Sequence, residues 1–334
     1  MVTSISPPGP TPIFIVGMPR SGTTLLTSML SAHPRIAIAP ETHYLCYWRQ
    51  EYQALELADP QDFERFWQAL SHSQRFSYFG IDAHKTRERI LAKGSPCHHH
   101  ILWGWLEEYA RTIHKPRWGE KTPLHYQHLH QLFSWFPQAR VIWMLRDPRA
   151  VAASLQKVPW ASRYMHVHGQ QWQESLTQFE QNWQKDARVM LLSYENLVQQ
   201  PEKSLIALCQ FLGEAYTPDM IRARSKTHTP MINRQGWAAQ HLNSALQPLS
   251  VGTIHKWQHT LANHQIEIID SLTFPQAADY GYVPRAPSPM GTYARGSLAL
   301  EKLRVKLDRK LAHWQTNLTR QPRKTGTHIG AGPK

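Results

Sequence analysis

A strand, a glycine-bracketed loop and a helix follow one another near the start of this 334-residue chain. Residues 13–16 (IFIV) form an apolar run typical of a strand buried on both faces. The loop GMPRSGTT covers residues 17–24, and apolar residues then recur at helical spacing from Leu25 to Leu30. This order places free backbone N–H groups at a helix N-terminus, where they and the helix dipole attract phosphate. The stretch therefore predicts a phosphate-binding site.

This loop differs at one position from the loop of an ATP- or GTP-hydrolysing protein. Gly17 and Gly22 are five residues apart, as in the general phosphate loop. Thr23, however, stands where those proteins carry the lysine that reaches the β- and γ-phosphates. The cation of this loop is Arg20, two residues before the second glycine. The loop can therefore hold a phosphate without the lysine of a nucleoside triphosphatase.

Further strands and helices alternate along the chain. Residues 140–145 and 189–193 are apolar strands, residues 36–39 are a short extended segment, and the intervening stretches have helical patterns. This alternation predicts an α/β fold, a parallel sheet flanked by helices, whose ligands bind beyond the carboxyl ends of the strands. Residues 44–117 are helical and rich in aromatic residues, and we expect this insertion to build an acceptor pocket.

The net charge of +13 is concentrated at the C-terminus. Residues 285–334 hold eleven Lys/Arg and two acidic residues, a balance of +9, whereas the other 284 residues hold 26 and 22. The mildly basic body suits an enzyme that binds a polyanionic nucleotide, and it matches no nucleic-acid-binding module. We therefore expect no nucleic-acid partner.

Three cysteines, Cys46, Cys97 and Cys209, have no metal-binding spacing and are expected to be buried in a reducing compartment. No apolar run is long enough to span a membrane and no signal peptide is evident, so the expected location is the cytoplasm. The run His98-His99-His100 favours a helix start or loop and no metal site, because consecutive side chains of a helix point in different directions.

A second motif identifies the family that this chain resembles. Residues 136–155 (FPQARVIWMLRDPRAVAASL) end a strand at Arg146, with Ser154 eight residues later. An always-charged fork donor and a hydroxyl suit a 3′-phosphate. Together with PRSGTT at 19–24, this motif resembles the sulfotransferases that use 3′-phosphoadenosine 5′-phosphosulfate (PAPS). The resemblance extends from Pro12 to Pro284 and includes WGEKTP (118–123), residues 189–213 and residues 249–257.

The resemblance implies a set of cofactor-binding residues and a metal-free transfer to an acceptor hydroxyl. Arg20 and Lys121 are expected to stabilise charge on the moving sulfuryl group. Glu41 is the expected general base, because a segment of the tyrosylprotein sulfotransferases is closely similar around it; His43, His125 and Glu120 are the alternatives. The cofactor, PAPS with adenosine 3′,5′-bisphosphate as its product, is expected to contact Arg20, Ser21, Gly22, Thr23, Thr24, Arg146, Ser154, Tyr194 and Lys256.

The chain departs from the tyrosylprotein enzymes in its late loop, where His241 and Gln247 stand near the positions of a serine and a lysine. The tyrosylprotein enzymes also have a Golgi anchor and paired cysteines, which this chain is expected to lack. A small molecule, carbohydrate or lipid is therefore the expected acceptor. A P-loop kinase, or a nucleotide-binding protein without sulfotransferase activity, is the alternative reading.

We predict a flexible arm over 1–12, a sulfotransferase domain over 13–284 and a basic C-terminal extension over 285–334. In the extension, leucines and a tryptophan recur at steps of three and four, which predicts a helix. That helix is expected to dock on its own domain, with dimerisation or contact with an anionic membrane as the alternatives. The recurring residues are Leu300, Leu303, Leu307, Leu311, Trp314 and Leu318.

Overall fold

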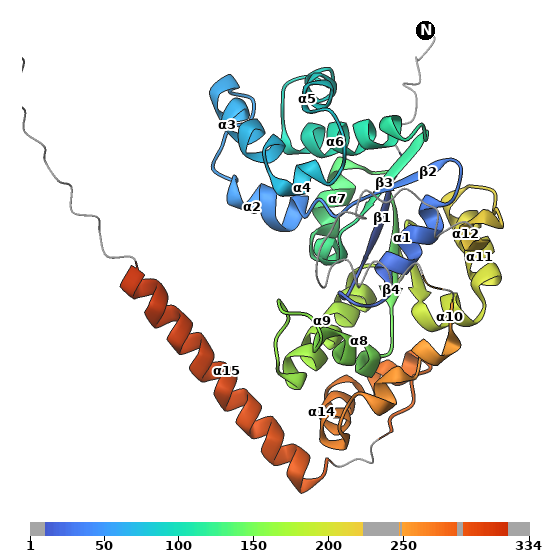
Figure 1. Ribbon diagram of the computed structural model, residues 1–334, viewed down its shortest axis with the longest axis vertical. Coiled ribbons are helices and arrows are strands. Elements are labelled where there is room, and N and C mark those ends of the chain that lie inside the picture. Colours follow the sequence, from blue (N-terminus) through green and yellow to red (C-terminus); the bar gives the residue numbers. More distant parts are fainter. Residues whose placement is uncertain (1–10, 223–246, 248, 286–289, 320–334) are drawn as a thin grey trace, which may run out of the picture.

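A computed structural model describes residues 11–222, 247, 249–285 and 290–319 of the protein, with the side chains of the last helix described as far as Asp308 (Figure 1). The arm predicted over residues 1–12 lies almost wholly outside the described residues, and so does His241. The proposed domain boundary at residue 284 stays a prediction.

Five parallel strands form one sheet in the order β2-β3-β1-β4-β5. The parallel sheet predicted from the alternation of strands and helices is therefore confirmed. The strands are β1 (Ile13–Gly17), β2 (Ile36–Ala39), β3 (Arg117–Lys121), β4 (Arg140–Leu145) and β5 (Val189–Ser193).

Strand β3 is the element for which the sequence predicts no strand. Its sequence, RWGEK, contains three charged residues, so it lacks the apolar run of a buried strand. It nevertheless lies between β2 and β1, with Ile15 of β1 opposite Lys121. Gly119 permits this pairing, because a Cβ atom there would lie 2.2 Å from the carbonyl oxygen of Ile13. Glu120 and Lys121 of β3 are buried because they have partners at the site described below, whereas Arg117 is only partly buried and pairs with Glu214.

Alternate residues of β1 face two different cores. Phe14 and Val16 belong to the core that includes residues of α6 (His98–Thr112) and α9 (Met165–Asn182). Ile13 and Ile15 belong to the opposite core, with α1 (Thr23–Ser31) and α11 (Pro201–Leu212). Helices therefore cover both faces of the sheet, as a buried parallel sheet requires.

The chain between β2 and β3 is helical, as predicted, and packs through aromatic side chains around Phe66 and Trp105 (Figure 1). His98 begins α6, which confirms the expected helix start; its Nδ1 lies 2.9 Å from the Tyr44 hydroxyl. Besides α6, this insertion comprises a π-helical turn (Tyr44–Trp48), α2 (Arg49–Glu51), α3 (Pro60–Ser71), α4 (Gln74–Ser77) and α5 (Ala83–Leu91).

The cysteine prediction is only partly right. Cys209 is buried, but Cys46 and Cys97 are partly exposed, and all three are free thiols. Burial raises the pKa of the Cys46 thiol, but hydrogen bonds from His125 and His43 outweigh burial and lower it to about 7. The prediction is wrong for Cys46 and Cys97 because the burial of a cysteine depends on tertiary contacts that the local sequence does not show. Within the described part of the chain, no group of three or more His, Cys, Asp or Glu side chains could hold a metal ion.

The helix predicted in the C-terminal extension is confirmed as α15 (Thr292–Thr319), which extends away from the rest of the chain in Figure 1. No described helix, α15 included, combines the length and apolarity needed to cross a bilayer. The other helices after β3 are α7 (Leu129–Trp135), α8 (Pro148–Leu155), α10 (Tyr194–Gln199), α12 (Asp219–Arg222) and α14 (Asn263–Thr273).

Candidate active site

The loop between β1 and α1 turns sharply at three residues with positive φ. These are Gly17 (φ 131°), Arg20 (φ 76°) and Gly22 (φ 94°). A Cβ atom at Gly17 would lie 2.4 Å from the carbonyl oxygen of Met144, and one at Gly22 would lie 2.4 Å from the ring of Tyr194. Both glycines are therefore required by their contacts as well as by their backbone angles. Helix α1 begins directly after Gly22, so its first N–H groups lie at the loop.

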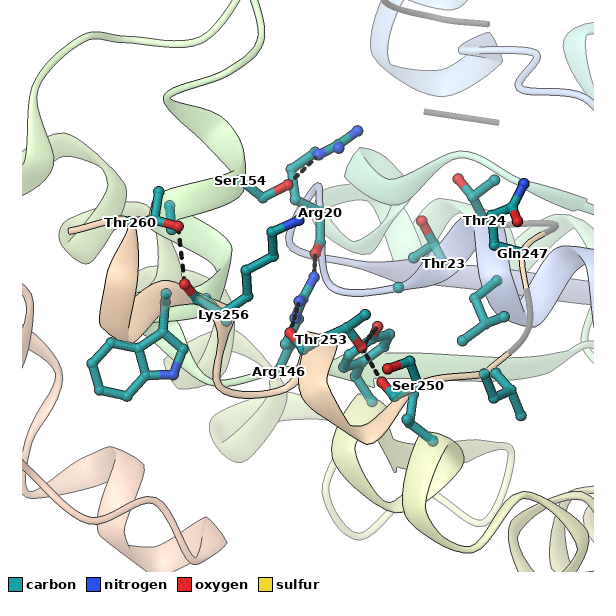
Figure 2. Close-up of a pocket in the computed structure, with 18 of the residues that line it drawn as sticks. Arg20, Thr23, Thr24, Arg146, Ser154, Gln247, Ser250, Thr253, Lys256 and Thr260 are labelled. Carbon is teal, nitrogen blue, oxygen red and sulfur yellow. Dashed lines mark hydrogen bonds between the residues drawn. The ribbon is translucent and has the colours of Figure 1, made fainter. Parts of the chain in front are cut away.

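The two sequence motifs meet beyond the carboxyl ends of β1 and β4 (Figure 2). Arg20 donates from Nε to the Ser154 hydroxyl at 2.9 Å, and Arg146 donates to the carbonyl oxygen of Arg20 at 3.1 Å. Arg146 directly follows β4, and Asp147 caps α8 by accepting from the Arg149 amide at 2.8 Å. The cap begins α8 at a position that presents Ser154 to Arg20.

Tyr194 and the segment after residue 249 close the other side of the site. The guanidinium of Arg146 lies 4.1 Å from the centre of the Tyr194 ring, a cation–π contact. The Tyr194 hydroxyl lies 3.1 Å from Thr253 Oγ1, and Arg146 also donates to the Thr253 carbonyl oxygen at 3.5 Å. Tyr194 therefore holds Arg146 in position, and its predicted contact with adenine stays a prediction.

These residues line a cavity of about 300 Å³. The predicted cofactor residues that line it are Arg20, Gly22, Thr23, Thr24, Arg146, Ser154, Tyr194 and Lys256. Ser21, the remaining one, is almost completely buried beside Arg20. The Lys256 side chain points into the cavity (Figure 2). Four cations and no carboxylate are found among the described lining residues, so the cavity suits a polyanion.

Several lining residues escaped the sequence-based prediction. Lys157 stands three residues after Ser154, in the turn that follows the end of α8 at Leu155, and this short spacing could have indicated it. Thr253 and Trp257 belong to the segment 249–257 that resembles the family, but of that segment only Lys256 was predicted to contact the cofactor. The other lining residues not predicted are Leu25, Ala150, Ala153, Val198, Gln247, Leu249, Ser250 and Thr260.

Glu41 lies between Lys121 and His43 at the carboxyl ends of β2 and β3. Lys121 donates from Nζ to Glu41 Oε1, and His43 Nε2 lies 2.8 Å from Glu41 Oε2. Arg75 donates to the Glu41 carbonyl oxygen at 3.1 Å. The side chains of Glu41 and His43 are 23% and 29% exposed, which leaves both accessible to an acceptor, whereas Lys121 is only 3% exposed.

The charges link Glu41 to the phosphate loop. Burial would raise the pKa of Glu41, but Lys121 and His43 outweigh it and hold the pKa well below its usual value. Burial, and then the nearby Arg146, lower the pKa of Arg20 to about 10, while Glu41 acts to raise it. Arg20 is therefore within electrostatic reach of both the Ser154–Arg146 group and Glu41.

Glu120 and His125, named above as alternative bases, lie behind Glu41 and are fully buried. Glu120 accepts from the Thr42 amide at 3.2 Å and from the Thr42 hydroxyl, and it forms an ion pair with Nδ1 of His125. The Leu45 amide lies 3.2 Å from His125 Nε2. Neither residue is accessible to an acceptor, so neither can serve as the base. Their contacts with Thr42 and Leu45 instead hold the segment that carries Glu41.

Comparison with known proteins gives one consistent family. A model of the sulfotransferase family matches residues 12–218. Protein-tyrosine sulfotransferase A of Caenorhabditis elegans is 24% identical over 303 residues, which cover 83% of this chain and 68% of that protein. Protein-tyrosine sulfotransferase 1 of Danio rerio is 25% identical over 295 residues, which cover 83% and 74%.

The solved structures support the fold. The sulfotransferase domain of the Synechococcus PCC 7002 olefin synthase has a TM-score of 0.54 at 21% identity, covering 80% of this chain and 95% of that domain. The chain therefore shares the fold of that domain.

Proposed function

The chain belongs to the sulfotransferase family, and from this premise we propose that it transfers the sulfuryl group of PAPS to an acceptor hydroxyl. The observation that carries the proposal is the meeting of Arg20, Arg146 and Ser154 at a cavity beside the N-terminus of α1, within electrostatic reach of Glu41. Phosphate and sulfonate are both stabilised by such a cluster of donors.

In this proposal the nucleotide occupies the cationic cavity. The N–H groups at the start of α1 and the loop from Ser21 to Thr24 bind the 5′-phosphosulfate, and Arg146 with Ser154 binds the 3′-phosphate. Lys256, which lines the same cavity, adds a further cation. A kinase is a poorer fit, because a kinase site needs carboxylates to hold Mg²⁺ and the described lining contains none.

The proposed chemistry is an in-line displacement at sulfur. Glu41 accepts the proton of the acceptor hydroxyl as its oxygen attacks, and the O–S bond to the nucleotide breaks, leaving adenosine 3′,5′-bisphosphate. Arg20 and Lys121 stabilise the negative charge on the moving group. Lys121 has a second role, because a bound sulfonate competes with Glu41 for its ammonium. When Lys121 moves from Glu41 toward the sulfonate, the pKa of Glu41 would rise and Glu41 would become a better base.

For the acceptor we propose a hydroxylated small molecule, carbohydrate or lipid. Gln247, which lines the cavity, stands near a position where the tyrosylprotein enzymes are expected to carry a polar or cationic group that contacts the sulfonate or leaving group. The contacts of the tyrosylprotein enzymes therefore do not carry over at this position, and we propose that their acceptor does not carry over either. A tyrosine of a protein is the second candidate, because the relatives reported above are protein-tyrosine sulfotransferases.

Calorimetric titration with adenosine 3′,5′-bisphosphate and with AMP tests the nucleotide. The bisphosphate is expected to bind much more tightly, and Arg146→Ala is expected to weaken its binding by about 10- to 100-fold, the usual scale for a charged hydrogen bond. AMP binding should change little in the variant. Arg35→Ala is the control, since Arg35 is an exposed arginine paired with Glu214. Equal affinity of the wild type for the two nucleotides would reject the proposed 3′-phosphate site.

Transfer of labelled sulfate from PAPS tests the acceptor. The panel contains phenols, sugars, hydroxylated lipids and tyrosine-containing peptides. Labelling of the peptides alone would favour the second candidate, whereas labelling of any of the other classes supports the proposal.

A further inference from the structure

Between Thr292 and Asp308, where its side chains are described, helix α15 packs on the domain through one face. Ala294 is 1% exposed, and Leu298 packs against the core that α14 shares with α8. Just before the helix, the Gly291 amide donates to Glu267 Oε2 of α14 at 2.8 Å. This part of α15 docks on its own domain, as we expected, but the docked residues occupy only one side of the helix.

The acidic residues of α15 are held at the start of α9. Glu301 accepts from the backbone amides of Met165 and His166 at 3.3 and 3.1 Å, and its Oε2 lies 2.8 Å from His166 Nδ1. It thereby takes the place of a cap, because Tyr164 at the N-cap makes no side-chain capping bond. Asp308 accepts from the Tyr164 hydroxyl at 2.9 Å. These two are the only acidic residues between 292 and 308, and both point toward the domain.

Apart from Asp308, which stays 49% exposed, the large exposed residues of this part of α15 are apolar or basic. Leu300, Leu303 and Leu307, at steps of three and four, are 55%, 54% and 49% exposed. Tyr293, seven residues before Leu300, is 75% exposed. We call these four residues the leucine face. Three basic residues lie between and beside the leucines and are also exposed: Lys302, Arg304 and Lys306.

We propose that the leucine face of α15 binds the surface of an anionic lipid bilayer. Apolar side chains on one side of a helix, flanked by lysine and arginine, are the combination that places a helix in the plane of a membrane interface. The leucine face is complementary in charge to an anionic surface, because both acidic residues of this part of the helix bond to the start of α9. A second copy of the chain is a poorer occupant, since two such faces carry charge of the same sign and repel each other.

The geometry leaves room for this contact. Figure 1 shows α15 extending away from α14, and the leucine face is exposed as far as Leu307. The helix is not apolar enough to enter the bilayer as a span, so the contact is peripheral. This inference is independent of the proposed sulfuryl transfer, because it involves none of the residues of the candidate active site.

The test is flotation of the full chain with vesicles of phosphatidylcholine alone and of phosphatidylcholine mixed with phosphatidylglycerol. The wild type should float with the mixed vesicles only, and less so as salt rises. The variant Leu300→Gln/Leu303→Gln/Leu307→Gln keeps a good helix former at each site and should lose binding by at least about tenfold. The matched control is Leu91→Gln/Ile206→Gln/Val283→Gln, which removes three exposed apolar side chains elsewhere and should bind as the wild type does.

Two further measurements keep the outcome decisive. Circular dichroism and adenosine bisphosphate binding show whether the leucine variant is folded. Light scattering after size exclusion gives the mass of the wild type and the variant. Failure of the wild type to float with the mixed vesicles overturns the proposal. The proposal is also overturned if the folded leucine variant floats as well as the wild type does. It is overturned, too, if the wild type is a dimer that becomes monomeric in that variant and neither protein binds lipid.

Discussion

Both carboxylate oxygens of Glu41 have a partner, Lys121 on one side and His43 on the other. A general base must be ionised and within reach of the proton that it removes. The first condition is met because Lys121 and His43 depress the pKa of Glu41. The second depends on the movement of Lys121 toward a bound sulfonate, as proposed above. The ion pair with Lys121 therefore keeps Glu41 ionised, but it also occupies Glu41 and keeps it from accepting a proton until the cofactor is bound.

Replacement of Glu41 by glutamine should lower the transfer rate by about two to four decades, the usual scale for a general base. The affinity for adenosine 3′,5′-bisphosphate should barely change, because Arg20, Arg146 and Ser154 are intact. Since the pKa of Glu41 in the free enzyme lies well below 4.5, kcat/KM of the wild type should show no loss from this group between pH 7 and 5. Single-turnover transfer and calorimetry measure the two effects.

The prediction for Glu41 has a clear contradiction and a control. A Glu41→Gln variant that turns over normally would remove Glu41 from the chemistry and leave His43 as the next candidate. Glu107→Gln is the control, because Glu107 also pairs with a lysine, Lys93, but lies outside the site.

Sequence reasoning predicted that Arg20, Arg146 and Ser154 lie at one site, but it did not predict the contacts among them. Arg20, Arg146 and Ser154 follow strands in recognisable motifs, so their arrival at one edge of the sheet was predictable. The pairing of Glu41 with Lys121 was not, because the two residues are 80 positions apart and meet only through the order of β2 and β3. Glu120 and His125 were named as possible bases because the sequence shows their residue types but does not show that both are completely buried.

At the scale of elements, the end of β3 holds the segment that follows β2. Glu120 binds Thr42 through its amide and hydroxyl, while the next residue, Lys121, binds Glu41. Successive side chains of a strand point in opposite directions, so one strand end supports the segment on two sides. Glu120 and Lys121, which make these contacts, are two of the three charged residues that prevented the prediction of β3 as a strand.

Glu120→Gln should destabilise the protein by roughly 3–5 kcal/mol, the range for breaking a buried ion pair, because it leaves His125 without its counter-charge. The bond from the Thr42 amide can survive, since glutamine keeps a carbonyl acceptor. Urea unfolding measures the loss. His125→Gln should be similarly harmful, and the double variant should be less unstable than the sum of the two single ones. Strict additivity would show that the pair is not coupled.

At the scale of the whole molecule, Arg149 joins parts of the chain that are far apart in sequence. Its guanidinium makes two bonds to Asp147 at the end of β4, at 2.9 and 2.8 Å, and donates to the Val283 carbonyl oxygen at 2.9 Å. It lies 3.6 Å from Asp270 of α14 and 4.2 Å from the ring centre of Trp257, which lines the cavity. Arg149 thus connects the cationic cavity to the C-terminal part of the chain, a connection that no local pattern predicts.

Arg149→Met should cost roughly 3–5 kcal/mol of stability, because it keeps the apolar stem but leaves two buried carboxylates without their counter-charge. It should also weaken nucleotide binding, since Trp257 loses the cation that packs on it. Denaturant unfolding and calorimetry with adenosine 3′,5′-bisphosphate measure the two effects.

The chain offers a matched control for Arg149 in Arg188. Arg188 makes the same two-bond fork to an aspartate two residues earlier, Asp186, at 3.0 and 2.7 Å, and also packs on an aromatic ring, that of Phe133. Its side chain is 35% exposed, however, against 4% for Arg149. Exposed pairs contribute about 1 kcal/mol or less, so Arg188→Met should be nearly neutral and leave nucleotide affinity unchanged. If the two variants were equally stable, burial would not be what makes Arg149 important. The connection between the cavity and the C-terminal part would then rest on apolar packing alone.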